Sequence, residues 1–197
     1  MKKKIILLLV FVLLLTGCGK NTKISEISLK GNTNADLTWS YEISDYSIIG
    51  IDSEKYSGME SKSDDDYFGG TYTFYVNGKK EGIAKIKFNF GQSWTKEYNY
   101  SYTVTFKVDK DLNITKEKEE GSYLALLKVI NNIDKLELDK DMDDYEFTFD
   151  DEKVKVNKED CYLGKIKDLS GDGNTLEIAV SDDNIYYKQD DNYEKIK

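Results

Sequence analysis

The 197-residue sequence contains no histidine, no arginine and no proline. Without histidine, Ser-His-Asp and Cys-His catalysis and His-ligated zinc are excluded. Without arginine, the chain cannot hold a phosphate or a carboxylate through a bidentate guanidinium group. Paired carboxylates of the glycosidase kind stay possible among 37 acidic residues, but no spacing singles out a pair. We therefore expect a protein that is not an enzyme and that uses no cofactor.

The first residues have the layout of a bacterial lipoprotein export signal. Three lysines precede an unbroken apolar run, Ile5 to Leu15, and Leu-Thr-Gly leads directly into Cys18. About eleven residues span only about 16 Å as a helix, whereas a bilayer core needs about 30 Å. The sequence therefore predicts a signal peptide over residues 1–17, a short tether over 18–22, and acyl chains such as palmitate on Cys18. The expected location is the outer face of the cell membrane.

Acidic residues dominate the remaining chain. Without the three lysines of the signal, 25 lysines stand against 37 acidic residues, which gives a net charge of −12. Such a surface repels nucleic acid, so we expect no nucleic-acid partner. If Cys18 is acylated, Cys161 has no partner for a disulfide within the chain, and we interpret it as a partly buried small hydrophobic residue.

From Ile24 to Val108 the apolar residues recur at every second position, as in Ala84, Ile86, Phe88 and Phe90. This pattern is typical of strands with one buried face, and no helical stretch interrupts it. Asn77-Gly78 separates two such strands and predicts a hairpin turn. The pattern favours a β-sandwich or a small barrel, which we place at residues 23–115.

The pattern changes after a charged segment, Lys116 to Glu120, which we interpret as a break between domains. Apolar residues from Tyr123 to Ile133 then have helical spacing, and Ser122 is a candidate N-cap. Five short strand-like stretches follow, and the tail from Ser181 onward is expected to be a solvated hairpin. We predict a small α+β domain over residues 116–197, whose role the sequence does not indicate.

Three loop motifs stand in a fixed order in the first domain. The first loop is Asn32, Thr33, Asn34, Ala35, Asp36 and Leu37, directly before Thr38-Trp39. The second loop is Tyr67, Phe68, Gly69 and Gly70, with Phe74 four residues after its last glycine. The third loop is Gln92, Ser93 and Trp94, at the end of a thirteen-residue stretch that begins at Gly82.

These motifs resemble those of the chagasin family of cysteine-protease inhibitors. The family pattern G-x-A-x-I-x-F-x-Y-x-R-P-W is matched in every spacing from Gly82 to Trp94, although Gln92 and Ser93 replace its arginine and proline. In the first loop the family's N-P-T-T-G-aromatic-x-W agrees at its ends but not in its middle. In the second loop Tyr67 replaces the first glycine of G-x-G-G.

The resemblance implies an immunoglobulin-like sandwich that inserts its three loops into the active-site cleft of papain-like proteases. Such a wedge needs rigidity and shape rather than acid or base groups, and an exposed tryptophan is a residue type enriched at binding hot spots. Trp39 has strand spacing and is expected in the core, whereas Trp94 follows a turn and is expected at the contact. The alternative is a surface lipoprotein that uses the sandwich for adhesion or envelope scaffolding without inhibiting a protease.

One further motif resembles the start of a calcium loop. Asp168, Ser170 and Asp172 have the spacing D-x-S-x-D-G, but Ala179 occupies the position of the bidentate glutamate. We interpret the segment as a hairpin turn and keep calcium as a weak alternative.

Overall fold

The computed structural model describes residues 23–31, 37–58, 69–136, 138, 144–169 and 174–196. The signal, Cys18, Asn32 to Asp36, and Tyr67-Phe68 lie outside these residues, so the predictions made for them are not examined by the structure. Among the residues described, no helix is long and apolar enough to cross a membrane.

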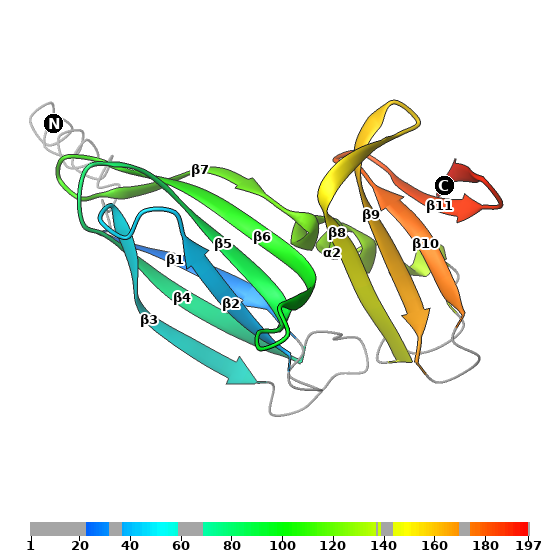
Figure 1. Cartoon of the computed structure of the whole chain (residues 1–197), viewed down its shortest axis with the longest axis horizontal. Helices are drawn as coiled ribbons and strands as arrows, with labels where there is room; N and C mark the ends of the chain where they lie inside the picture. The colour runs from blue at the N-terminus through cyan, green and yellow to red at the C-terminus, as the bar shows by residue number, and fades with distance from the viewer. Residues whose placement is uncertain are drawn as a thin grey trace, which may run out of the picture.

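The N-terminal part is a sandwich of two antiparallel sheets (Figure 1). The three-stranded sheet has the order β1-β4-β3, formed by Ile24–Lys30, Gly70–Gly78 and Ile49–Gly58. The four-stranded sheet has the order β2-β5-β6-β7, formed by Thr38–Ile43, Gly82–Gln92, Glu97–Val108 and Ile114–Glu120. The predicted all-β sandwich is confirmed.

Alternation explains why these residues form the two sheets. The alternating apolar residues from Ala84 to Phe90 in β5 and from Tyr100 to Val108 in β6 point between the sheets and are buried, while the intervening lysines and threonines lie toward solvent. The fully buried side chains of this layer include Phe74, Ile86, Phe88, Val104 and Phe106.

The prediction of a hairpin at Asn77-Gly78 is wrong. Strand β4 pairs with β1 and β3, not with β5, so the chain crosses from one sheet to the other after Gly78. The glycine is needed for packing, because a Cβ there would lie 2.8 Å from the side chain of Val108 and 2.9 Å from the carbonyl oxygen of Leu112.

The interpretation of Lys116 to Glu120 as a break is also wrong. These residues form most of β7, which pairs antiparallel with β6 at the edge of the four-stranded sheet. Their charged side chains are mostly exposed, as is usual for an edge strand that must not pair with other molecules. The sandwich sheet thus continues to Glu120; the domain limits themselves stay a prediction.

A helix and a five-stranded sheet make up the C-terminal part, in agreement with the predicted α+β unit. Helix α2 (Ser122–Ile130) and the 3-10 helix η1 (Ile133–Leu136) precede a sheet of order β12-β11-β10-β9-β8. Its strands are Tyr145–Val156, Glu159–Asp168, Thr175–Val180, Ile185–Gln189 and Asn192–Lys195, in the order β8 to β12. Strands β11 and β12 form the expected C-terminal hairpin.

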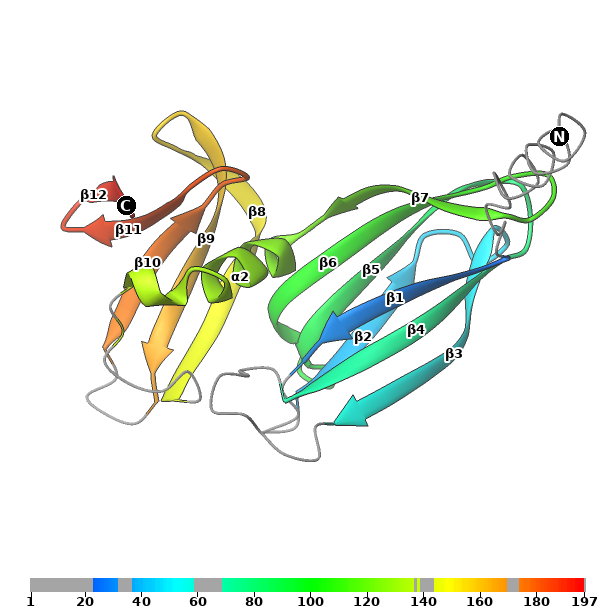
Figure 2. The same ribbon diagram turned by 180° about the vertical axis from the view of Figure 1, so that it is seen from behind.

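Helix α2 lies across one face of this sheet and also contacts β6 of the sandwich (Figure 2). Its first turn differs from the prediction: the N-cap is Gly121, at φ 134°, and Ser122 is the first helical residue. The Ser122 hydroxyl accepts a hydrogen bond from the backbone N–H of Ser101 at 2.9 Å, so it ties the helix to β6 instead of capping it. One hydrophobic core runs from the sandwich through α2 into the second sheet.

Candidate functional site

The third loop is the tight connection between β5 and β6. The backbone N–H of Lys96 donates to the carbonyl oxygen of Gln92 at 3.0 Å, and the Thr95 hydroxyl donates to the same oxygen at 3.2 Å. Lys96 has φ 58°, which closes the turn in the left-handed region. These contacts hold the loop in one shape although Ser93 replaces the proline of the family pattern.

Trp94 projects from this turn and 64% of its surface is exposed. Trp39, in contrast, is 5% exposed and lies in the core. The structure therefore separates the two tryptophans as their spacing predicts, and Trp94 is available to a partner.

A bulge at the base of the third loop sets its direction. The pairing of β5 with β6 shifts register between Phe90 and Gly91, and Gly91 has φ 156°. A Cβ on Gly91 would lie 2.3 Å from the carbonyl oxygen of Glu97. The close approach of the two backbones therefore requires glycine here.

The three loops emerge at the same end of the sandwich, which we call the loop end: Gly31, Leu37, Gly69-Gly70 and residues 92–96. The N–H of Gly31, where the first loop starts, donates to the carbonyl oxygen of Gly70, where the second loop ends, at 3.2 Å. Thr38, directly after the first loop, pairs with Gly91 at the base of the third. The ends of these strands lie together at the lower edge of the sandwich in Figure 1.

Two large aromatic side chains support the loop end from below. The Trp39 indole N–H donates to the carbonyl oxygen of Lys30 at 3.2 Å, and the Tyr123 hydroxyl accepts from the N–H of Lys30 at 2.9 Å. The two rings meet edge to face, with centroids 5.2 Å apart. Burial raises the pKa of Tyr123 to about 12, so this hydroxyl stays neutral at physiological pH. Helix α2 thus fixes the backbone from which the first loop departs.

Sequence reasoning missed Tyr56, an exposed residue on β3 at this end. Its ring packs at a tilt against Tyr72 with centroids 4.7 Å apart and covers Gly70, where a Cβ would lie 2.4 Å from the Tyr56 hydroxyl oxygen. The glycine of the second loop therefore makes room for an aromatic side chain. No motif marks Tyr56, because its place beside Gly70 follows from the pairing of β3 with β4.

At the loop end, Leu37 is half-buried and packs against the core. The other predicted residues do not join the loop end. Cys161 is buried and unpaired, as interpreted from the sequence, and desolvation raises the pKa of its thiol. Asp168 ends β9, where its N–H donates to the carbonyl oxygen of Asn174 at 2.9 Å; Ser170 and Asp172 lie outside the described residues. Within the described part of the chain no cluster of three potential metal ligands is found.

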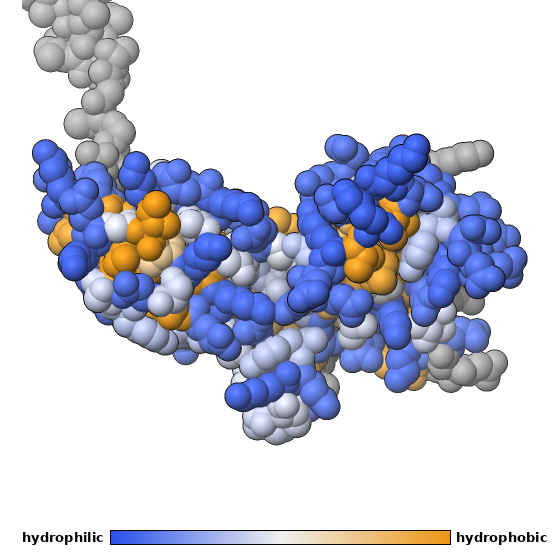
Figure 3. Space-filling model, turned by 45° about the horizontal axis from the view of Figure 1, so that its top comes forward, coloured by the Kyte–Doolittle hydropathy of each residue, from blue (hydrophilic) through white to orange (hydrophobic). Residues whose placement is uncertain are grey.

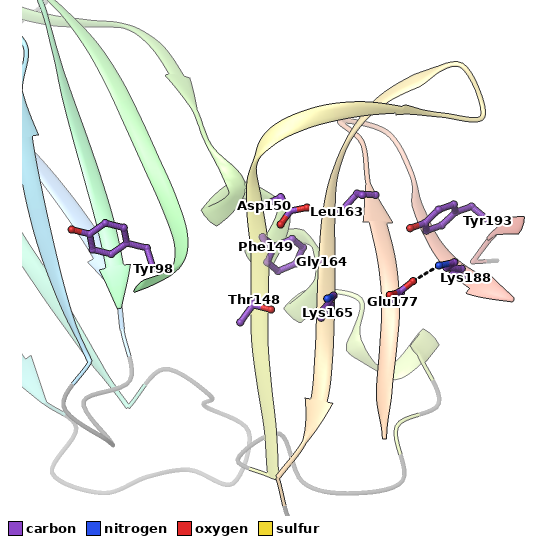
Figure 4. Close-up of a pocket in the computed structure, with 10 residues that line it drawn as sticks. All are labelled: Tyr98, Thr148, Phe149, Asp150, Leu163, Gly164, Lys165, Glu177, Lys188 and Tyr193. Carbon is purple, nitrogen blue, oxygen red and sulfur yellow. Dashed lines mark hydrogen bonds and ion pairs between the residues drawn. The ribbon is translucent and has the colours of Figure 1, made fainter. Parts of the chain in front are cut away.

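A hollow of about 450 Å³ lies between Tyr98 of β6 and the face of the second sheet (Figure 4). Glu177 and Lys188 on this face form an ion pair at 2.5 Å. The hydrogen bond from Lys188 holds the pKa of Glu177 below its ordinary value. Glu177 therefore lacks the raised pKa that the general acid of a glycosidase needs.

The N-terminal part of the chain is similar to a known protein family. Residues 20–108 match the family model described as chagasin family peptidase inhibitor I42. The N-terminal sandwich matches the chagasin family. This match confirms the resemblance inferred from the loop motifs, and it ends at the last residue of β6.

Among solved structures, the chain is similar to the cysteine protease inhibitor EhICP2 from Entamoeba histolytica. The two share 19% sequence identity with a TM-score of 0.37, and the similarity covers 42% of this chain and 75% of that one. No curated protein matches the sequence. The family model leaves out about 90 residues of this chain, 109–197, which contain the edge strand β7 of the sandwich and the C-terminal unit.

Proposed function

We propose that this protein is a membrane-anchored inhibitor of papain-like cysteine proteases, which enters their active-site cleft with the loop end of its sandwich. The observation that carries the proposal is the exposed Trp94 on a hydrogen-bonded turn, at the same end as the strand termini that flank the other two loops. The chagasin-family match over residues 20–108 supports the class of target. Lipid on Cys18 supplies the anchor.

The mechanism needs no chemistry from the inhibitor. The turn from Gln92 to Lys96 is already closed by backbone and Thr95 hydrogen bonds, so little conformational entropy is lost when it enters a cleft. Trp94 offers a large, rigid apolar surface to the cleft walls. Gly70 leaves space for Tyr56, which puts a second exposed aromatic ring beside the second loop.

The experiment is a titration of papain with the purified protein, its Trp94→Ala variant and its Tyr46→Ala variant. Tyr46 is a matched control, because it is 60% exposed and lies at the opposite end of the sandwich. If Trp94 is a hot spot, its truncation weakens inhibition by about 30-fold or more, which corresponds to about 2 kcal/mol. Tyr46→Ala leaves the inhibition constant unchanged.

Two results would count against the proposal. Absence of inhibition by the unmutated protein at micromolar concentration removes papain as a target and favours adhesion or scaffolding. Equal potency of all three proteins would place the contact outside the third loop.

A further inference from the structure

The end of the sandwich opposite the loops is a second continuous surface, which we call the turn end. It consists of the start of β1, the connections 44–48, 79–81 and 109–113, and the strand residues beside them, Ile83 near the start of β5 and Ile114 at the start of β7. The connections are packed together: the N–H of Lys79 donates to the carbonyl oxygen of Ile48 at 2.8 Å, and a Cβ on Gly82 would lie 2.7 Å from the Ile48 side chain. The turn end is thus a formed surface and not a set of independent loops.

Apolar and aromatic side chains are exposed on the turn end. Ile83 is 64% exposed, Tyr46 60% and Ile24 47%. Ile48, Leu112 and Ile114 lie half-buried behind them. Figure 3 shows apolar residues gathered at this end of the sandwich among charged ones. Exposed isoleucines beside a tyrosine are typical of protein surfaces that meet the headgroup region of a bilayer.

The charge of the turn end also differs from that of the molecule. Lys23 and the three connections contribute four lysines: Lys23, Lys79, Lys80 and Lys110. They contribute four acidic residues: Asp45, Glu81, Asp109 and Asp111. Two of these acids face backbone donors, since Asp45 accepts from Ser47 and Asp109 from Asp111 and Asn113. A neutral surface on a protein whose net charge without the signal is −12 is the part least repelled by anionic lipids.

The position of the turn end fits a lipid on Cys18. The described chain begins at Lys23 on this end, five residues after Cys18, so an extended tether reaches at most about 20 Å at about 3.3–3.6 Å per residue. Strand β6 has 12 residues and runs from the loop end to the turn end, so the eleven steps between its first and last residue span about 36 Å at about 3.3 Å per residue. The turn end is therefore the part of the sandwich that the tether holds nearest to the bilayer.

We infer that the turn end docks on the outer leaflet that carries the lipid of Cys18, so that Trp94 points away from the membrane toward soluble proteases. This inference rests on the anchor in the proposed function. The contact adds apolar burial to the lipid anchor and fixes the orientation that the tether alone leaves free.

The test uses the full chain, produced in a lipoprotein-processing bacterium and reconstituted into phosphatidylcholine–phosphatidylglycerol vesicles with or without brominated phosphatidylcholine. An Ile83→Trp variant reports contact with lipid through quenching of its added fluorescence. Leu124→Trp is the matched control, since Leu124 is 39% exposed on α2. We expect brominated lipid to remove more than half of the added emission for Ile83→Trp. We expect brominated lipid to leave unchanged the emission of the Leu124→Trp variant and that of the unmutated protein, in which Trp94 is the exposed tryptophan.

Several outcomes overturn the docking. They are an unquenched Ile83→Trp variant on vesicle-bound protein, equal quenching of both variants, and quenching of the unmutated protein. A doubled mass together with lipid-independent shielding at Ile83→Trp would assign the surface to a second copy of the chain. Papain inhibition by the same vesicles separates the two proposals, because inhibition without quenching overturns the docking alone. A protein that mass spectrometry shows to lack acyl chains overturns the anchor and the docking together.

Discussion

Trp39 and Trp94 are the same residue type in opposite environments, and local sequence explains both. Trp39 alternates with other apolar residues of a strand, so it is buried under the loop end, where its indole N–H finds the Lys30 carbonyl. Trp94 follows a turn beyond the last strand residue and stays exposed. Burial could be predicted from the spacing, whereas the partners of Trp39 could not, because Tyr123 reaches it from 84 positions further along the chain.

Glu159 is a residue whose ionisation links stability to pH. Its carboxylate accepts hydrogen bonds from the Ser181 hydroxyl, from Tyr186 at 2.8 Å and from Asn184 at 2.7 Å, and these bonds hold its pKa below the ordinary value of 4.5. Because the pKa is lower in the folded state, the stabilisation is complete above the ordinary value and is lost as the pH falls through the lowered one.

We therefore expect Glu159→Gln to be less stable than the unmutated protein at pH 7 and to lose less stability than that protein between pH 5 and pH 3. Urea unfolding over this range measures the effect. Glu152→Gln, on the exposed stretch of β8, is the matched change of charge and should keep the pH dependence of the unmutated protein. If the free energy of unfolding falls equally with pH in the unmutated protein and in Glu159→Gln, this carboxylate does not contribute to the pH dependence of stability.

At the scale of elements, the β5–β6 hairpin is the part that places Trp94, and Gly91 is the residue on which its geometry depends. Gly91→Ala would put a Cβ 2.3 Å from the Glu97 carbonyl oxygen, in a backbone conformation that favours glycine. We expect a loss of about 1–3 kcal/mol in the free energy of unfolding and weaker papain inhibition.

Thermal or urea unfolding and the papain assay measure both effects of Gly91→Ala. Ser93→Ala, at an exposed position of the same hairpin, is the control for stability and should stay within about 0.5 kcal/mol. A Gly91→Ala protein of unchanged stability and potency would contradict the role given to the bulge.

The elements that sequence reasoning missed have a common physical reason. The charged residues of β7 show no apolar alternation, because an edge strand is stabilised by its pairing with β6 and needs little burial of its own. Ser122 resembles an N-cap, but its hydroxyl is used by Ser101 of a strand 21 positions earlier. Asn77-Gly78 has the residues of a hairpin turn, yet β4 pairs with the distant strands β1 and β3, and the chain passes to the other sheet after Gly78. Contacts distant in sequence decided each case.

At the scale of the whole molecule, the C-terminal unit is part of the support of the loop end. The hydroxyl of Tyr123 on α2 accepts a hydrogen bond from the N–H of Lys30, just before the first loop. The shared core joins α2 to β6 of the sandwich and to β8 and β10 of the second sheet. A role for this unit could not be predicted from its sequence. The helical spacing places Tyr123 on the apolar face of the helix, but it does not show which residues of the sandwich Tyr123 contacts.

Tyr123→Phe tests this coupling. It leaves the Lys30 N–H without its acceptor in a partly buried site, so we expect a loss of about 1–3 kcal/mol in stability and faster hydrogen exchange at Lys30. Hydrogen exchange and papain titration of the variant measure the effect on the first loop. Tyr46→Phe, at the turn end, is the control that should change neither. Unchanged exchange at Lys30 in Tyr123→Phe would mean that the helix does not stabilise the loop end.

The central claim, that the loop end occupies the active-site cleft of a papain-like protease, is tested most directly by blocking the cleft. Binding of the protein is measured by calorimetry to papain, and to papain whose cleft is filled by a peptide-like covalent blocker on the catalytic cysteine. The account predicts binding to free papain and an affinity at least about 100-fold weaker for the blocked enzyme. Equal affinity for the two forms would contradict it.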